Sequence, residues 1–216
     1  YIEVIKKVVH EQEQIFGELP EYDYNEYTFL ACYMPNATGD GMEHRNSTYV
    51  VSQRSLATGG IEENIGTIAH EFFHCWNVER IRPKALEPFR FDEANMSGEL
   101  WFAEGFTNYY DDLSLVRAGI ISQEKFIQAL NGTFNYVWTS PARQFFNPIE
   151  MSYQAPFVDA AKSVDEVNRE NTFISYYSYG SMLGLALDLS LREKGLNLDD
   201  YMKLVWNTFG KTQIGY

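Results

Sequence analysis

The chain has 216 residues, with 17 basic and 30 acidic side chains and a formal net charge of −13 at pH 7. Nucleic acids and anionic membrane surfaces attract clustered Lys and Arg, so this balance argues against both as partners. No apolar run reaches the length that a membrane-spanning helix needs, and the chain is long enough to bury a substantial core. We therefore expect a single domain over residues 1–216.

The N-terminal part of the chain predicts one helix and a small β element. Residues 1–16 form an amphipathic pattern that ends at Gly17. Residues 27–34 and 48–53 are rich in β-forming side chains, and the turn-prone stretch 35–41 follows the first of them. We therefore expect a β-hairpin or small sheet near the N-terminus.

The sequence His-Glu-Phe-Phe-His at 70–74 lies in a predicted helix over residues 61–77 that is apolar nearly all round. Residues four apart share one face of a helix, so His70 and His74 can reach one metal ion, with Glu71 beside it as a base. Alternatively, both histidines are hydrogen-bonded inside an ordinary core helix. Two imidazoles and a carboxylate are costly to bury without a ligand, so the pattern favours a metal site.

A third ligand is expected because catalytic zinc usually has three protein ligands and keeps one position for water. Glu104 is the lone acid of an aromatic run in a second predicted helix, residues 99–118. A buried carboxylate of this kind is protonated or bound to a cation. Together, His70, His74 and Glu104 form the His2Glu set of thermolysin-like zinc peptidases, so we expect one Zn2+ ion.

Metal-bound histidines usually donate their second N–H to an acceptor. Asn108 follows Glu104 by one helical turn, so we expect it to accept such a bond from a ligand histidine. Asp111 or Asp112, a further turn along the helix, could serve instead. These two acids could equally form a solvated helix end.

The remaining pattern is mostly helical. Between residues 139 and 172 it is weak and predicts irregular structure. The whole chain therefore predicts a predominantly helical α+β fold. The two cysteines, Cys32 and Cys75, are expected to be buried free thiols. Further helices are expected at residues 122–138, 175–194 and 198–208.

Two motifs, HEFFHCWNVERIRP and LWFAEGFTNYYDDL, resemble those of the glycyl aminopeptidase family of gluzincin metallopeptidases. GMEHRNST and YYSYG stand in the order that this family has, and the resemblance covers about residues 40–195. It implies a thermolysin-like catalytic domain, which in such proteins typically accompanies an N-terminal β-domain and a C-terminal PDZ-like domain. Neither is visible in this sequence, and the chain starts within an amphipathic pattern. We therefore expect a fragment of a longer protein.

The resemblance implies that Gly41, Met42 and Glu43 belong to an active-site edge strand, which pairs with the substrate backbone. Glu43 matches the residue that grips the free α-amine of the substrate in related larger aminopeptidases. The match is partial, because Asp40 stands where those enzymes have Gly and His44 where they have Asn. The alternative is a solvated hairpin with ordinary surface charges.

The resemblance also implies a role for Tyr177, in the segment YYSYG. A phenol is neutral at pH 7 and can donate a hydrogen bond to the oxyanion that develops in the transition state. Tyr176 and Tyr179 are alternatives for this role. With 15 tyrosines in the chain, a packing role for any of them is a competing interpretation.

Together, these residues and the resemblance predict a zinc-dependent aminopeptidase, and the resemblance implies that it removes small N-terminal residues, Gly or Ala, from peptides. Glu71 would take a proton from the attacking water and deliver it to the leaving amine. Two alternatives stay open: an endopeptidase with the same metal chemistry, and a zinc-containing binding domain without turnover. Glu71 argues against the binding domain, because a site without turnover does not need a base.

Overall fold

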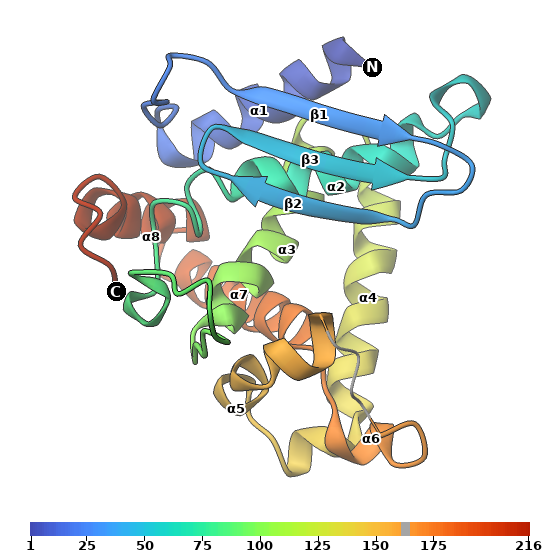
Figure 1. The fold of residues 1–216 in the computed structure, drawn as a ribbon, viewed down its shortest axis with the longest axis vertical. Coiled ribbons are helices and arrows are strands. Elements are labelled where there is room, and N and C mark those ends of the chain that lie inside the picture. The colour runs from blue at the N-terminus through green and yellow to red at the C-terminus, as the bar shows by residue number, and fades with distance from the viewer. Residues whose placement is uncertain (161–164) are drawn as a thin grey trace.

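The computed structural model describes residues 1–160 and 165–216. Helices dominate this part of the chain and one small sheet is present (Figure 1), which confirms the predominantly helical α+β class. The α-helices and strands are α1 (Ile2–Phe16), β1 (Thr28–Tyr33), β2 (Asp40–His44), β3 (Ser47–Ser52), α2 (Ile61–Phe73), α3 (Leu100–Arg117), α4 (Gln123–Thr139), α5 (Pro148–Tyr153), α6 (Arg169–Thr172), α7 (Tyr176–Arg192) and α8 (Leu198–Val205).

The central strand of the sheet is β3, and the strand order is β1-β3-β2. β1 runs parallel to β3, with Phe29 opposite Thr48, whereas β2 runs antiparallel to it, with Gly41 opposite Val50. Parallel strands cannot be joined by a tight turn, so the hairpin connects β2 to β3 and not β1 to β3. As a result, β2 is an outer strand of the sheet (Figure 1).

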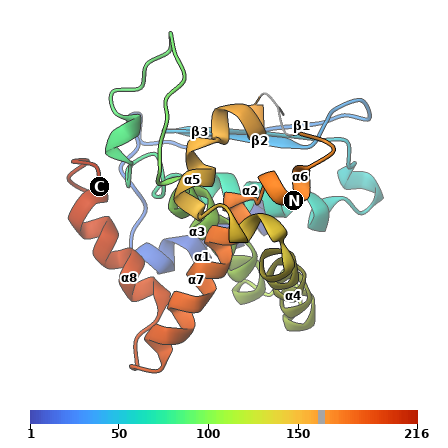
Figure 2. The same cartoon turned by 90° about the horizontal axis from the view of Figure 1, so that it is seen from below.

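Helix α2 is buried between the sheet and the other helices (Figure 2). On one side, Ile65 and Ile68 share a buried cluster with Val50 of β3. On the other side, Phe73 stacks on Tyr110 of α3, with ring centroids 4.9 Å apart. Side chains in such close-packed surroundings have little freedom to shift, so the packing fixes the rotation of α2 about its axis.

Helices α3 and α7 cross in direct backbone contact. A Cβ on Gly180 would overlap the carbonyl oxygen of Trp101, and a Cβ on Gly105 would lie 2.7 Å from the carbonyl carbon of Gly180. Only glycine permits such an approach at these two positions. The crossing brings the start of α7, with Tyr177, close to the part of α3 that carries Glu104.

The expectation of irregular structure between residues 139 and 172 is wrong for part of this segment, because α5 and α6 lie in it. Asn147 caps α5 through a capping box with Glu150, in which each side chain accepts the other residue's backbone N–H at 2.9 Å. Helices this short show no clear hydrophobic period. Residues 161–164, which the expectation also covers, lie outside the described residues.

Two further expectations concern the membrane and the cysteines. Within residues 1–160 and 165–216, no helix is long and apolar enough to cross a membrane. Both cysteines are free, as expected. Cys75 is buried, but Cys32 is only half-buried because it lies on the outer strand β1.

Candidate metal centre and active site

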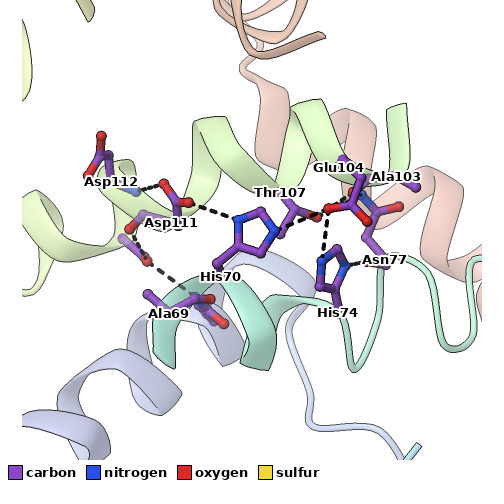
Figure 3. Close-up of polar contacts among 11 residues, drawn as sticks. Ala69, His70, His74, Asn77, Ala103, Glu104, Thr107, Asp111 and Asp112 are labelled. Carbon is purple, nitrogen blue, oxygen red and sulfur yellow. Dashed lines mark hydrogen bonds and ion pairs between the residues drawn. The ribbon is translucent and has the colours of Figure 1, made fainter. Parts of the chain in front are cut away.

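His70 and His74 project from one face of α2 toward Glu104 of α3 (Figure 3). His70 Nε2 lies 3.2 Å from Glu104 Oε2, and His74 Nε2 lies 3.3 Å from the same oxygen. The three side chains therefore offer ligand atoms that all lie within 4.8 Å of one another. His74 is the last residue with helical backbone at this end of α2, so the four-residue spacing still places both imidazoles on one face.

The other nitrogen of each imidazole has its own partner. His74 Nδ1 donates to the backbone oxygen of Asn77 at 2.5 Å, and His70 Nδ1 lies 3.0 Å from Asp111 Oδ2. The expectation for Asn108 is wrong, since this residue makes no hydrogen bond to either histidine in the described part of the chain. Asp111 stands about two full turns after Glu104 and so lies closer to the same line along α3 than Asn108 does.

These partners test whether the site fits a metal. A backbone carbonyl only accepts, so His74 carries a hydrogen on Nδ1, and its Nε2 offers a lone pair to a metal ion once the second ring proton is lost. Both Nε2 atoms face one carboxylate oxygen, which is favourable only if the imidazoles are protonated or a cation lies between the groups. Two imidazole nitrogens and one carboxylate oxygen are a suitable donor set for a divalent ion such as zinc.

The charged groups of His70, His74 and Glu104 shift one another's pKa values. Burial acts to raise the pKa of Glu104, but His74 and His70 outweigh it and hold this pKa well below its usual value. Burial acts to lower the pKa of His74, but the Glu104 carboxylate outweighs it and raises this pKa to about 9. In the absence of a cation, the imidazoles thus supply the positive charge that the buried carboxylate requires.

Glu71 lies beside this cluster and faces β2. Its carboxyl is buried, and burial raises its pKa to about 7, although His74 and His70 act in the opposite direction. Glu43 of β2, Glu71 and His74 also offer ligand atoms within 4.8 Å of one another. Two carboxylates therefore share the space between β2 and α2, an arrangement that suits a positively charged group.

Strand β2 presents alternate residues to Glu71. A Cβ on Gly41 would overlap Glu71 Oε1 and lie 2.6 Å from Glu71 Cδ. Successive residues of a strand point to opposite faces, so Glu43 shares the face of Gly41 whereas Met42 points away. The Met42 side chain is 52% exposed, and the structure does not bring it to the site. The backbone oxygen of Met42 accepts a hydrogen bond from Thr48 Oγ1 of β3 at 3.1 Å.

Among the three candidate tyrosines, Tyr177 is the one whose ring is paired with a histidine of the cluster. Its ring centroid lies 6.1 Å from that of His70, with an angle of 29° between the planes. Tyr176 is buried in a cluster of apolar side chains, and both Tyr177 and Tyr179 pack against that cluster. The geometry therefore favours Tyr177 over its two neighbours.

Two buried amides beside the cluster were not anticipated from the sequence. Asn77 Nδ2 donates to the backbone oxygens of Phe102 and Ala103, at 3.2 and 3.0 Å, and so ties the end of α2 to α3. Gln12 Nε2 of α1 donates to the backbone oxygen of Ala69 at 2.7 Å. Both amides interrupt apolar patterns, and a polar residue at a core position is the signal that could have revealed them.

Comparisons with known proteins agree with this geometry. The family model of the M61 glycyl aminopeptidases matches residues 63–183, a range that contains the histidines, Glu71, Glu104 and Tyr177. The crystal structure of an aminopeptidase N family protein from Idiomarina loihiensis is similar to this chain, with a TM-score of 0.88 and 31% sequence identity. That match covers 100% of this chain and 37% of the other, so this chain spans little more than a third of that protein. No curated protein matches. The chain belongs to the M61 glycyl aminopeptidase family, a family of peptidases.

Proposed function

We propose that this protein is a zinc-dependent aminopeptidase that removes small N-terminal residues from peptides. The observation that carries the proposal is the convergence of His70 Nε2, His74 Nε2 and Glu104 Oε2, with Glu71 beside them. Three protein ligands of this kind leave a coordination position open, which is typical of catalytic zinc and not of structural zinc. The placement of His70 and His74 on α2 and of Glu104 on α3 supports the thermolysin-like assignment of the domain.

Zinc held by these residues would supply Lewis acidity, which activates water and polarises a carbonyl group. The remaining steps belong to the chain's own side chains. Asp111 and the backbone oxygen of Asn77 keep the imidazoles of His70 and His74 in orientation through their Nδ1 atoms. Such partners also fix which nitrogen of each ring faces the ligand position.

Glu71 acts as general base and then as general acid. Its carboxylate accepts a proton from the attacking water and delivers that proton to the nitrogen of the leaving amine. Burial raises the pKa of Glu71, which favours the second half of this transfer, in which the carboxyl group holds the proton before the leaving amine takes it. Tyr177 donates its phenolic hydrogen to the carbonyl oxygen as negative charge develops there.

The choice of an aminopeptidase over an endopeptidase depends on Glu43. This carboxylate lies on the outer strand β2, close to Glu71 and His74. A peptide that pairs with the edge of β2 would bring its α-ammonium to Glu43, and the ion pair would fix the register of the first residue. The preference for Gly follows the family description, glycyl aminopeptidase, and the preference for Ala follows the resemblance of the sequence motifs alone.

The test uses the natural full-length protein, loaded with one equivalent of zinc, and a panel of aminoacyl reporters with free and N-acetylated amines. We expect turnover of the free Gly and Ala reporters and loss of turnover on acetylation, because acetylation removes the charge that Glu43 meets. Equal cleavage of free and acetylated peptides would favour the endopeptidase. Tight zinc binding without any cleavage would favour the binding domain.

A further inference from the structure

The backbone of β2 lies directly against the carboxylate of Glu71. A methyl group on Gly41 would overlap Glu71 Oε1, and it would lie 2.6 Å from Cδ and 2.7 Å from Cγ of the same side chain. Non-bonded carbon atoms pack at about 3.5–4.0 Å. The gap beside the Cα of Gly41 therefore holds only a hydrogen atom, and a side chain there would displace either β2 or the side chain of Glu71.

Strand β2 cannot easily move away from Glu71 to make room for a methyl group on Gly41. Gly41 pairs with Val50 of β3, whose side chain is 1% exposed in the core, and Glu43 pairs with Thr48, which is fully buried. A shift of β2 would break this pairing and disturb the core beneath it. The backbone of Glu71 belongs to α2, which is packed on both sides. The carboxylate end of the Glu71 side chain is therefore the part that can give way.

We infer that Gly41 is a positioning residue for the base: its lack of a side chain sets where the Glu71 carboxylate lies. The inference rests on the proposed function and adds a second task to the edge strand, which then both receives the peptide and holds the base. The strand lies against one side of the Glu71 carboxylate, and the candidate metal ligands His70 and His74 project from the same helix as this base. Gly41 itself donates or accepts no proton.

Gly41→Ala in the full-length zinc protein tests this inference. We expect kcat to fall about 10- to 100-fold, because displacement of a catalytic group by about 1 Å can cost 10²-fold in rate. KM and zinc content should stay within about two-fold of wild type, since the three atoms nearest to the new methyl group all belong to Glu71. A wild-type kcat in Gly41→Ala would overturn the inference.

The chain offers two matched controls. Gly39 precedes β2 and Gly66 lies on α2, and a Cβ at either position would meet no atom within 4 Å. Gly39→Ala makes the same substitution in the segment just before β2, and Gly66→Ala makes it on α2. Neither new methyl group would contact Glu71. Equal losses of kcat in these controls and in Gly41→Ala would show a general effect of stiffening the chain, and the inference would be wrong.

A double-mutant cycle separates an effect through Glu71 from an effect on the strand. Glu71→Ala removes the side chain that the new methyl group would strike, so adding Gly41→Ala to it should change neither the residual turnover nor the melting temperature. If the two substitutions instead reduce turnover or stability independently, Gly41 acts on β2 and not on the base.

Crystal structures of wild type and Gly41→Ala give a readout that needs no activity. We expect the Glu71 carboxylate to be displaced while β2 keeps its register with β3 and the three ligand side chains stay in place. A displaced β2 beside an unmoved Glu71 would overturn the inference. If the wild-type protein cleaves no peptide, the proposed function fails, but this structural comparison still decides whether Gly41 sets the position of Glu71.

Discussion

The helical side and the strand side of the candidate site are held by different means. On the helical side, His74 is 1% exposed, and each imidazole has a second partner in the protein interior. On the strand side, Glu43 lies on an outer strand, and its neighbours Met42 and His44 are exposed. The helical side is thus held by interior contacts before any ligand arrives, whereas the strand side ends in an outer strand of the sheet, which a peptide can extend.

This difference separates the expected functions of the two sides. Packed helices can hold metal ligands and a base to the accuracy that catalysis requires. An outer strand can bind many peptides through its backbone and distinguish them through a few side chains. Substitutions on the helical side should therefore change kcat or metal affinity, and substitution of Glu43, the strand side chain expected to meet the peptide, should change KM and the choice of substrate.

The largest effect is expected for Glu71→Gln. The amide keeps the shape of the side chain but cannot accept the proton, so kcat should fall about 10²- to 10⁴-fold while the zinc stays bound. Steady-state kinetics with metal analysis measures both quantities, and Glu63→Gln, an exposed position on α2, is the control. Loss of zinc from Glu71→Gln, or nearly normal turnover, would show that the base is misassigned.

Tyr177→Phe should lower kcat about 10²- to 10³-fold, the cost of removing one donor to an oxyanion. The phenylalanine ring keeps the contact with His70, so metal content and KM should change little. The same kinetics on Tyr176→Phe and Tyr179→Phe tests the two neighbours. If either of those variants carries the loss in kcat instead, the oxyanion donor is that tyrosine.

A smaller effect is expected for Asp111→Asn, which weakens the acceptor of His70 Nδ1. Loss of such a partner typically lowers metal affinity about 10- to 100-fold, and competition with a chelator would measure it. Asn108→Ala is the matched control, because Asn108 makes no hydrogen bond to the histidines in the described residues. Equal losses of affinity in both variants would contradict the assignment to Asp111.

The smallest effect is expected for Glu43→Ala, on the strand side, and it should appear in KM. Loss of one charged hydrogen bond should raise KM for free-amine substrates about 10-fold and narrow the gap between free and acetylated peptides. Zinc affinity should not change. His44→Ala, an exposed neighbour on the opposite face of β2, is the control. A fall in kcat alone would place Glu43 with the catalytic groups of the helical side.

The sequence by itself determined the long helices and the local geometry of the candidate metal site. A periodic apolar pattern predicts a helix directly, and a helix places residues four apart on one face, so the convergence of His70 and His74 followed from spacing alone. Glu104 could be identified because a lone acid in an apolar helix needs a cation. The family also followed from these motifs, because they are specific and contiguous in the chain.

The tertiary structure alone decided how separate elements meet. Asp111 and not Asn108 faces His70, and β1 pairs with β3 in parallel. The contact of Gly41 with Glu71 joins residues that are distant in the chain. Such contacts depend on the rotation and separation of packed elements, which change the neighbour of a side chain without changing any local pattern. Local periodicity predicts which residues share a face of a helix or strand. The distances between side chains of different elements are set only by the packing of the whole core.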